Sequence, residues 1–576
     1  MGINQESKAI ITKYAVKNAM DYGRADIGSV LGKVINVLKG IPISELRTEV
    51  EDIVNYVNKL KRNDLEKEYA QFKNEFDEMT KEKAEKTAKP KMIIEGAKEG
   101  EVVTRFPPEP GGYIHIGNMK QCILSDEFAK IYKGKIHLYF DDTNPEKCKQ
   151  EYVDGIKKDT EWMGIKFDRE YYASDFIEKV YDNGRKLIEG NNAYVCFCDS
   201  ETVKNSRKEG KVCPHMEHTK EQNTKFFDEM LNKKYKEGEA IVRLKGDMES
   251  DNDVFRDPTL FRVKMFKHYR QGEKYAVWPT YHMNTPIIDS INGVTDVIRG
   301  KEYEKWGAVH KKILDFLGLR MPRIHYEARL NIAGTTTAKR DIRKFIAEGI
   351  VEGWDDPRLV TIIALKRRGI QPEAIRNFVL RFGLSKTDSV VSMDMLRAEN
   401  KKIIEQKAKH LFFVKDPVKL IVKNGVNNFN AKLQLYPNTT TNFREYNVSN
   451  IFYISGDDAK SINKNDVIRL KDLFDIEVIS KEQGIVTAEI TDSKKYNKII
   501  QWVSENNYVK CSILIPGSLM DDNGGIIEDS LKILEGYVES YSEKLAAHEI
   551  IQFERFGYAI LDKKKPPMPQ FIFTSK

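Results

Sequence analysis

The chain has 576 residues, 40% of them hydrophobic, which is enough for several packed cores and too many residues for one domain. Ninety-four Lys and Arg residues against 87 Asp and Glu give a net charge of +7, which permits a polyanionic partner without demanding one. No apolar stretch approaches the length of a membrane span, the first residues lack the layout of a signal peptide, and the six cysteines are too irregularly spaced for a disulfide framework, so we expect a cytoplasmic protein with no membrane partner.

The first region of the chain is predicted to be helical. Apolar residues recur at helical spacing in residues 8–20 and 45–60, with Gly and Pro between the two runs. From residue 63 to residue 91 the composition turns to Lys, Glu and Ala with little apolar periodicity, which indicates a solvated helix or a hinge. We therefore predict a helical N-terminal region with a charged linker over residues 1–95.

Short strands and helices alternate in the next region, residues 96–335. The runs 101–106 and 136–142 read as strands, and each is followed by a run of helical periodicity. Such a βαβ unit predicts an α/β fold with a doubly wound parallel sheet of the Rossmann type. An insertion of mixed, cysteine-bearing sequence occupies residues 193–270.

The last two regions differ in their predicted structure. Residues 336–410 look helical, whereas residues 411–576 contain short β runs separated by Asn, Asp and Gly. The second pattern predicts one or two small antiparallel β-barrels. The clearest of these β runs are 418–423, 432–437, 466–473, 474–480, 484–490, 510–516 and 557–562.

The stretch RFPPEPGGYIHIGN, residues 105–118, joins the first strand of the βαβ unit to its helix. Ligands bind at this end of a parallel sheet, where the helix N-terminus offers unpaired N–H groups and positive dipole potential to a phosphate. Prolines stiffen the exit from the strand, glycines let a bulky ligand approach the main chain, and His115 can donate a hydrogen bond to a phosphate oxygen. The turn therefore suits a nucleotide, although its spacing fits a tight strand–helix turn with a surface histidine equally well.

The segment TRFPPEPGGYIHIGN resembles the signature of the glutamyl- and glutaminyl-tRNA synthetase family, whose HIGH motif stands here as His115-Ile116-Gly117-Asn118. The resemblance covers essentially the whole chain, in the block order of the archaeal and eukaryotic-like glutamyl branch. It implies a class I synthetase with a helical N-terminal region, a Rossmann-type catalytic domain, an acceptor-binding insertion, a helical stem-contact region and C-terminal β-barrels that bind the anticodon. The other blocks that carry it are KYAVKNAMDYGRADIGSVLGKV, YAVWPTYHMNTPIIDSINGVTDVIRGKEY, GLRMPRIHYEARLNI, GWDDPRLVTIIALKRRGIQPEAIRNFVLRFG and HEIIQFERFGYAILD.

The resemblance implies the ligation of L-glutamate to tRNA(Glu) in two steps. The glutamate carboxylate attacks the α-phosphorus of ATP, with Mg²⁺ bridging the phosphates and pyrophosphate leaving, and the terminal adenosine of the tRNA then attacks the acyl-adenylate. The catalytic residues that it implies are His115, Asn118 and Lys339. The residues that it implies for ATP binding are Pro107, Pro108, Glu109, Gly112, His115, Ile116, Gly117, Asn118, Lys339 and Arg340.

Two positions depart from the family's pattern. Asn118 replaces the last histidine of the HIGH motif and keeps an amide donor without a ring or a charge. The family's flexible lysine loop, KMSKS, stands here as TTAKR (residues 336–340), so Lys339 is retained while Ala338 replaces a serine that helps to close the loop. Because a lysine and a helix dipole supply the charge that stabilises phosphate, we predict an active enzyme.

The residues implied for amino-acid binding are Arg105, Tyr281 and Arg299. Arg299 also suits a carboxylate side chain on physical grounds, because a guanidinium binds a carboxylate through two parallel hydrogen bonds. An alternative for Arg299 is a structural ion pair with Glu302 or Asp296. Arg105 could instead clamp Glu109, although its place at the carboxyl end of the first strand favours the ligand.

The segment that begins at Trp354 resembles the part of the family that follows the lysine loop and meets the tRNA acceptor arm. The same residues fit the start of a helix, with Asp355 or Asp356 as N-cap and Pro357 in the first turn. The basic run 366–368 could meet phosphates or form a solvated face. The residues that the resemblance implies for tRNA binding are Trp354, Asp355 and Arg358.

Four residues of the insertion suit a metal ion. Cys196 and Cys198 form a C-x-C pair, and Cys213 and His215 form a C-x-H pair. These four ligands suffice for a closed tetrahedral zinc site of structural role, and some relatives carry zinc at a comparable insertion. The alternative is three reduced thiols packed in the insertion beside a surface histidine.

Several other functions stay open on the sequence alone. The nearest is the glutaminyl enzyme, because a few pocket groups decide between a carboxylate and an amide, and a broader variant charges both tRNA(Glu) and tRNA(Gln). The substitutions at Asn118 and Ala338 would also suit a non-catalytic tRNA-binding paralogue, which Lys339 and the complete C-terminal region argue against. That region likewise argues against truncated relatives that modify a tRNA base and against small-substrate nucleotidyltransferases. We predict a monomer.

Overall fold

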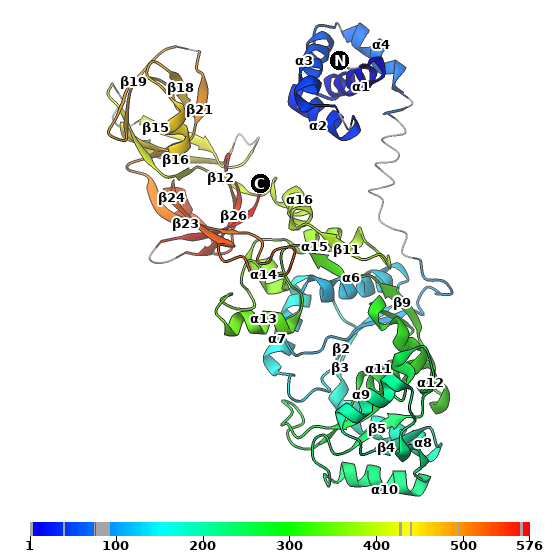
Figure 1. The fold of residues 1–576 in the computed structure, drawn as a ribbon. Coiled ribbons are helices and arrows are strands. Elements are labelled where there is room, and N and C mark those ends of the chain that lie inside the picture. Colours follow the sequence, from blue (N-terminus) through cyan, green and yellow to red (C-terminus); the bar gives the residue numbers. More distant parts are fainter. Residues whose placement is uncertain are drawn as a thin grey trace. The chain divides into compact units, whose positions relative to one another are not determined.

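The computed structural model describes residues 4–22, 24–38, 41–60, 62–73, 75–76, 93–424, 429–437, 441–493, 495–564 and 568–576. The chain divides into two compact units, residues 1–89 and residues 90–576 (Figure 1). Among the described residues, no helix is both long enough and apolar enough to cross a membrane.

The first unit is helical, as its apolar spacing predicts. Its helices are α1 (Gln5–Tyr22), α2 (Ile27–Val37), α3 (Ile43–Val57) and α4 (Arg62–Gln71). Ile11 of α1, Val34 of α2 and Val54 of α3 meet in one buried apolar core. Most of the predicted charged linker lies outside the described residues, because these omit residues 77–92.

A parallel sheet forms the centre of the second unit, as the βαβ pattern predicts. The strands β1 (Val103–Phe106), β2 (Lys135–Phe140) and β3 (Arg169–Tyr172) pair in that order and in parallel. The helices α6 (Ile116–Ile131) and α7 (Gln150–Trp162) connect them. Every residue of β2 after the first is buried, as expected of a parallel strand that is covered on both faces.

A second parallel pair continues the sheet beyond β1. The strands β8 (Asp296–Gly300) and β9 (Arg323–Glu327) are connected by α12 (Gly307–Leu317). Thr295 N donates a hydrogen bond to Val103 O at 2.9 Å, which joins the start of β8 to β1. The strands thus lie in the order β3-β2-β1-β8-β9, and the carboxyl ends of β1, β2 and β8 meet at one edge of the sheet. The predicted α/β fold is confirmed.

An antiparallel sheet with flanking helices interrupts this order between β3 and β8. Its strands pair in the order β4-β5-β6-β7, and the last of them ends at Pro279, beyond the predicted end of the insertion at residue 270. The elements from here to α12 are η1 (Ala173–Phe176), α8 (Ile177–Glu189), β4 (Ala193–Cys196), α9 (Ser200–Glu209), η2 (Pro214–Glu217), α10 (Lys220–Leu231), β5 (Ile241–Leu244), η3 (Asp253–Phe255), β6 (Thr259–Val263), β7 (Val277–Pro279), α11 (Tyr281–Ile291) and η4 (Lys301–Trp306).

Helices dominate the region that follows β9, as predicted. One difference is a parallel strand pair, in which β11 within the predicted helical region adds to β10. Two consecutive valines, Val390 and Val391, favour this extended backbone because β-branched side chains suit a strand better than a helix. The elements are β10 (Leu330–Ile332), α13 (Lys339–Ala347), α14 (Ile362–Arg367), α15 (Pro372–Leu380), β11 (Ser389–Val391) and α16 (Met393–Ile404).

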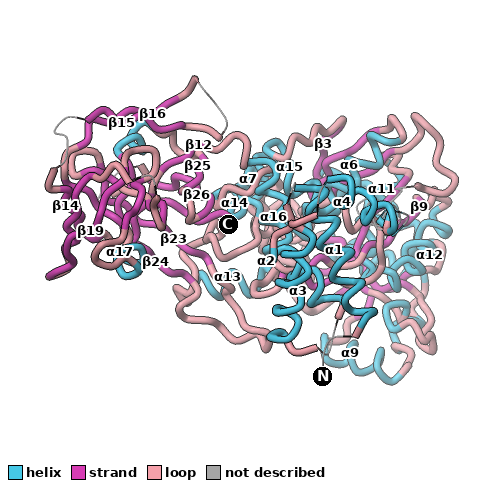
Figure 2. Tube along the Cα trace, turned by 90° about the horizontal axis from the view of Figure 1, so that it is seen from above, coloured by secondary structure: helices cyan, strands magenta, loops and turns pink. Residues whose placement is uncertain are grey.

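The C-terminal region consists mainly of strands, drawn in magenta in Figure 2. One seven-stranded sheet contains β12 (Lys409–Leu411), β25 (Ile550–Phe553), β26 (Gly557–Lys563), β27 (Gln570–Ser575), β23 (Tyr508–Pro516), β24 (Leu531–Glu539) and β13 (Phe413–Lys415). The other contains β21 (Lys498–Ile500), β18 (Val467–Leu470), β19 (Asp475–Glu482), β20 (Ile485–Ile490), β14 (Val418–Val422), β17 (Ile451–Ile454) and β22 (Val503–Ser504). The remaining elements are β15 (Phe429–Gln434), β16 (Phe443–Val448), α17 (Gly456–Ser461) and η5 (Ser540–Lys544).

The pairing in these sheets is mostly antiparallel, as predicted, but each sheet also contains two parallel pairs. Parallel strands cannot be joined by a tight hairpin, and the parallel partners here, such as β12 with β25 and β14 with β20, are far apart in the sequence. Every β run predicted from the sequence overlaps one of the strands.

Candidate active site

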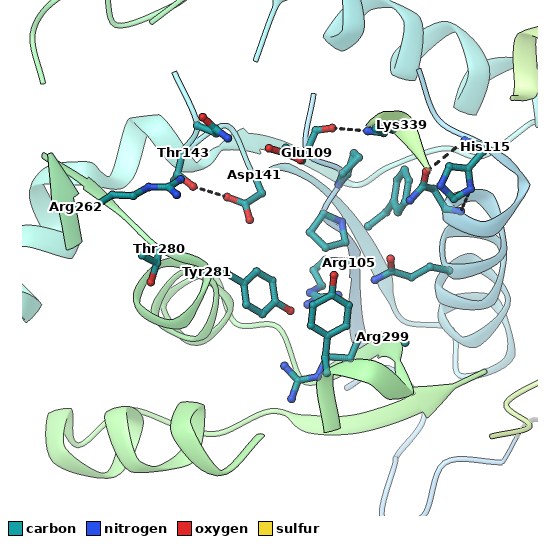
Figure 3. Close-up of a pocket in the computed structure, with 18 residues that line it drawn as sticks. Arg105, Glu109, His115, Asp141, Thr143, Arg262, Thr280, Tyr281, Arg299 and Lys339 are labelled. Carbon is teal, nitrogen blue, oxygen red and sulfur yellow. Dashed lines mark hydrogen bonds between the residues drawn. The ribbon is translucent and has the colours of Figure 1, made fainter. Parts of the chain in front are cut away.

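A cavity of about 510 Å³ lies at the edge of the sheet where β1, β2 and β8 end (Figure 3). It brings together side chains from the turn after β1, the turn after β2, the insertion, the end of β8 and the start of α13. Its lining includes Arg105, Pro107, Pro108, Glu109, His115, Asn118, Asp141, Thr143, Arg262, Thr280, Tyr281, Arg299, Tyr303 and Lys339. All three residues predicted to bind the amino acid and all three predicted catalytic residues therefore face one space.

His115 caps the N-terminus of α6 with its ring. Its Nδ1 accepts hydrogen bonds from Gly117 N at 3.1 Å and Asn118 N at 3.3 Å, and Asn118 Oδ1 accepts one from His115 N at 3.3 Å. These bonds satisfy backbone donors that a helix start leaves unpaired. They also give Asn118 a role in the helix cap, with its Nδ2 left as a donor beside the cavity.

The capping geometry fixes the protonation state of His115. Burial, together with the nearby Lys339 and Arg329 charges, lowers the pKa of His115 to about 3. A neutral ring whose Nδ1 accepts hydrogen bonds carries its proton on Nε2. His115 can therefore donate one hydrogen bond from Nε2 without carrying a charge.

Two glycines of the turn allow this close packing. A Cβ on Gly117 would lie 2.9 Å from both Cε1 and Nδ1 of His115, so any larger residue would displace the capping ring. A Cβ on Gly112 would lie 2.9 Å from the Trp354 ring and 3.1 Å from Lys339 Cδ. The absence of a side chain at Gly112 therefore lets the lysine stem and a tryptophan pack on the turn.

Lys339 begins α13 and reaches the turn after β1. Its Nζ donates a hydrogen bond to Glu109 O at 3.0 Å, as the dashed line in Figure 3 shows. Burial lowers the pKa of Lys339, and the Glu109 carboxylate opposes that shift. Arg343, one turn further along α13, donates to Gly111 O. The lysine loop is therefore docked on the proline- and glycine-rich turn.

The other residues predicted to bind ATP have different positions. Gly117 lines an adjoining cavity of about 320 Å³, together with Lys120, Glu327 and Thr337. Ile116 is buried in the core, and the Arg340 side chain is 94% exposed beside Asp341. The residues predicted for ATP binding that line neither cavity are Gly112, Ile116 and Arg340.

Arg105 and Arg299 differ in how their charges are balanced. Arg105 is fully buried and forms an ion pair with Asp289, with Nε 3.1 Å from Oδ1, so the predicted alternative of a clamp on Glu109 is wrong. Arg299 is also buried, but its partners are uncharged: Nη1 meets His310 Nδ1 and Nη2 donates to Tyr326 OH, each at 3.2 Å. Burial and the Arg299 charge hold the pKa of His310 well below its usual range, so His310 is neutral.

No carboxylate among the described residues pairs with Arg299. The two predicted alternatives, Asp296 and Glu302, pair instead with Arg323 at 2.7 Å and with Arg329 at 3.1 Å. Arg299 Nε has no partner in the described part of the chain. A buried cation without an anion is costly, which indicates that an anionic ligand completes this side of the cavity.

Asp141 is a site residue that the sequence did not reveal. It follows β2 and lines the cavity, where its Oδ1 accepts hydrogen bonds from Thr143 Oγ1 at 3.1 Å and Asn284 Nδ2 at 3.0 Å. Burial, together with the Glu109 charge, raises the pKa of Asp141 to about 7. Its signal was present in the stretch FDDTN, because an acidic residue directly after a parallel strand lies at the ligand-binding edge.

The residues predicted to bind tRNA lie apart from the main cavity. Trp354 packs against Tyr113 with ring centroids 5.9 Å apart, and Asp355 lies 3.3 Å from Arg367. Arg358 is 9% exposed and bonds to Asp356, to Ile350 O and to Ser530 Oγ, so its guanidinium is already engaged within the chain. The predicted helix start at residues 355–357 is wrong, because α14 begins at Ile362 and is capped by Thr361.

The four residues predicted to bind zinc converge in the insertion. Cys213 Sγ lies 3.6 Å from Cys196 Sγ and 3.8 Å from Cys198 Sγ, and His215 Nδ1 lies 3.5 Å from Cys198 Sγ and 3.4 Å from Cys213 Sγ. A tetrahedral zinc ion with ordinary bond lengths holds two sulfurs about 3.8 Å apart and a sulfur and a nitrogen about 3.5 Å apart. Four of the six distances between these ligand atoms therefore match those around a zinc ion, and all four atoms lie within 4.8 Å of one another.

The sequence of the chain matches known families over most of its length. Residues 101–406 match the family model described as tRNA synthetases class I (E and Q), catalytic domain, and residues 408–493 and 499–562 match the two models of its anti-codon binding domain. The chain is 39% identical to Glutamate--tRNA ligase of Nitrosopumilus maritimus, in an alignment that covers 100% of each chain. It is 36% identical to Glutamate--tRNA ligase of Thermococcus kodakarensis, over 99% of this chain and 100% of that protein. A crystal structure of Glutamate-tRNA Synthetase from Elizabethkingia anophelis matches with a TM-score of 0.41 and 20% identity, over 54% of this chain and 71% of that one.

Proposed function

We propose, because the chain belongs to the class I (E and Q) tRNA synthetase family, that it joins L-glutamate to tRNA in an ATP-dependent reaction. A carboxylate oxygen of glutamate attacks the α-phosphorus of ATP, and the bond to pyrophosphate breaks. A ribose hydroxyl of the terminal adenosine then attacks the acyl-adenylate, forming the ester and releasing AMP. Mg²⁺ enters with ATP and neutralises phosphate charge.

The observation that carries the choice of glutamate is the buried charge of Arg299, which forms no ion pair with any described residue. The side-chain carboxylate of glutamate supplies the missing anion and can accept two parallel hydrogen bonds from the guanidinium. The amide of glutamine offers one neutral oxygen and would leave the buried charge unbalanced. Arg299 therefore favours glutamate over the glutaminyl alternative, with Tyr281 beside it in the cavity.

The opposite end of the amino acid has a matching partner. Asp141 faces the same cavity, and an ammonium group beside it would favour the ionised form of this carboxyl. Arg105, held by Asp289, borders the space between the two ends. We therefore place the side chain of glutamate at Arg299, its ammonium at Asp141 and its reacting carboxylate toward His115 and Lys339.

The phosphates of ATP find donors and positive charge at the other side of the cavity. The N-terminus of α6 supplies dipole potential, His115 Nε2–H and Asn118 Nδ2–H supply donors, and Lys339 supplies a cation. These groups favour the charge that develops as pyrophosphate leaves, which lowers the barrier rather than only tightening binding. The same arrangement argues against a non-catalytic paralogue. The other residues that we assign to ATP are Pro107, Pro108, Glu109, Gly112, Ile116, Gly117 and Arg340.

We further propose a structural zinc ion in the insertion. It would be held by Cys196, Cys198, Cys213 and His215. Four protein ligands leave no open coordination position, so such an ion stabilises the fold of the insertion and takes no part in the reaction.

The RNA partner contacts the chain at two or more places in this proposal. Trp354, Asp355 and Arg358 stay assigned to the acceptor arm, with Arg358 acting through its buried contacts. The C-terminal sheets, which match anti-codon binding domains, take the anticodon of tRNA(Glu) and, in a broader variant, of tRNA(Gln). We expect the enzyme to act as a monomer in the cytoplasm.

A charging assay tests the proposed function. Purified protein is given ATP, Mg²⁺, labelled glutamate or labelled glutamine, and purified tRNA(Glu) or tRNA(Gln), and acid-precipitable label is measured. We expect ATP-dependent charging of tRNA(Glu) with glutamate and none with glutamine. Charging with glutamine would establish the glutaminyl alternative, and no charging of any tRNA would support the non-catalytic paralogue.

A further inference from the structure

A loop of the C-terminal sheet reaches the lysine loop of the active site. Residues 517–530 connect β23 to β24 and form an ordered hairpin, in which Gly517 N donates to Ser530 O at 2.7 Å and Ile527 N donates to Leu519 O at 3.0 Å. We call residues 517–530 the bracing loop. It lies within the match to the second anti-codon binding domain, far along the chain from Lys339.

The bracing loop pairs with the segment just before Lys339. Gly334 O accepts hydrogen bonds from Leu519 N at 2.7 Å and from Met520 N at 3.0 Å. Gly334 has a φ of +78°, and a Cβ there would lie 2.5 Å from Ser518 Oγ. Only a glycine therefore fits between the two segments in this arrangement.

The same loop also packs against the helix that Lys339 begins. Leu519 is fully buried in an apolar cluster with Ile342 and Phe345 of α13. These two residues follow Lys339 by three and six positions and lie on one face of the helix. Contacts of Leu519 and its neighbours thus fix the chain on both sides of the lysine.

The base of the bracing loop is anchored to the helical region between α13 and the C-terminal sheets. Arg358 Nη1 donates to Ser530 Oγ at 3.1 Å, and Arg368 and Arg397 each donate to Pro516 O at 3.3 Å. Arg358 and Arg368 are buried, so these hydrogen bonds are shielded from water. These hydrogen bonds therefore hold the base of the bracing loop in one position.

We infer that the bracing loop positions Lys339 over the reacting phosphates and that Leu519 is a positioning residue for the reaction. Leu519 lies in one apolar cluster with the buried face of α13, while Lys339 Nζ donates a hydrogen bond to Glu109 O at 3.0 Å. A misplacement of about 1 Å can cost roughly 100-fold in rate. Loss of the contacts of the bracing loop would therefore displace Lys339 and slow the reaction. The inference rests on the proposed function and adds that a residue of the C-terminal region serves the chemistry at phosphorus.

The test is a double-mutant cycle on tRNA charging in the full-length enzyme. We expect Leu519→Ala to lower kcat roughly 10-fold with less than twofold change in KM for tRNA, and Leu519→Met to restore most of the rate. In a Lys339→Ala background, Leu519→Ala should cost less than about twofold, because it acts through the lysine. The matched control is Phe316→Ala on α12, a 41% exposed residue outside the regions that we assign to the reaction or to tRNA, which should leave the rate unchanged.

A second readout does not depend on activity. Arg340 is exposed next to Lys339, so limited trypsin digestion reports how firmly this segment is held. We expect Leu519→Ala and Gly334→Ala to speed cleavage at residues 339–340 roughly 10-fold, and Phe316→Ala to have no effect. Unchanged kcat and cleavage in Leu519→Ala, or losses that simply multiply in the double mutant, would overturn the inference. If the wild-type protein charges no tRNA but the variants still differ from it in cleavage, this result would count against the proposed function. It would leave intact the inference that the bracing loop positions the segment around Lys339.

Discussion

The two buried arginines of the cavity differ in whether a carboxylate of the chain neutralises their charge. Arg105 is neutralised by Asp289, whereas the partners that Arg299 has among the described residues, His310 and Tyr326, carry no charge. A buried guanidinium without an ion-pair partner is costly, and because Arg299 lines the cavity, a ligand bound there can supply the anion. We infer from this difference that Arg299, rather than Arg105, binds the side chain of the substrate.

Replacing Arg299 tests that assignment. Loss of a buried charged partner costs about 2–4 kcal/mol, which is roughly 30- to 1,000-fold in affinity. We expect Arg299→Gln to raise KM for glutamate by such a factor and to change KM for ATP less than about threefold. Arg320→Gln is the matched control, because Arg320 bonds to Val294 O away from the cavity. An unchanged KM for glutamate would remove Arg299 from the amino-acid site.

The neutral state of His115 is a second prediction for a single residue. Its pKa is about 3 in the folded chain and 6.5 ordinarily, so the unfolded chain binds the extra proton between these values. This residue therefore makes the free energy of unfolding increase with pH from about 3 to 6.5 and leaves it constant above. NMR of labelled histidine should find His115 neutral, with its proton on Nε2, at every pH from about 5 to 8. An inflection near pH 6.5 would contradict the capping geometry.

Among single residues, the sequence predicted those that belong to a recognisable motif. His115, Asn118 and Lys339 were found because the turn and the lysine loop resemble known blocks, and the structure gathers them. Asp141 was missed although it directly follows a predicted strand, because it belongs to none of the motifs from which the site residues were predicted. The ion pair of Arg105 with Asp289, and the lack of an ion pair at Arg299 among the described residues, depend on distances between residues far apart in the chain, which no local pattern reports.

The N-terminus of α6 is the element on which the site depends most. Gly117→Ala places a Cβ 2.9 Å from the His115 ring, so the ring must leave its capping position. We expect a stability loss of about 0.5–2 kcal/mol, as for loss of a helix cap, and a fall in kcat of roughly 100-fold. Gly32→Ala in α2 is the control, because its Cβ meets no atom within 4 Å and should leave activity unchanged. A fully active Gly117→Ala enzyme would show that the cap is dispensable.

The insertion has its own test at this scale. We expect purified protein to contain about one zinc ion per chain, and Cys213→Ser to lose it and to melt at a lower temperature. Cys511→Ser serves as the control, because Cys511 is buried in the C-terminal core and should leave the metal content unchanged. Metal-free wild-type protein with the same melting temperature as Cys213→Ser would favour the alternative of packed thiols.

Elements with strong periodicity were predicted well and weak ones were not. The helix α6 and the strands β1 and β2 follow the predicted runs, because burial on one or both faces leaves a clear pattern. The strand β11 was missed because it is short and has meaning only beside β10. The parallel pairs of the C-terminal sheets also escaped prediction, since register between distant strands is set by tertiary packing.

Across the whole molecule, the active site depends on segments that span most of the second unit. The cavity takes residues from Arg105 to Lys339, and the bracing loop brings Leu519 from the C-terminal sheet to α13. The sequence predicted the order of these regions and the family to which they belong. It could not predict the contact of Leu519 with Gly334, because an apolar residue in a loop near a glycine has no signature of its own.

The most direct test of the account is the rate of charging in Lys339→Ala under single-turnover conditions with saturating ATP. If Lys339 stabilises the charge that forms as pyrophosphate leaves, the rate should fall roughly 100- to 1,000-fold, while the apparent affinity for ATP changes less than about threefold. A rate equal to that of the wild type would contradict the central claim that the helix start and this lysine act together on the triphosphate.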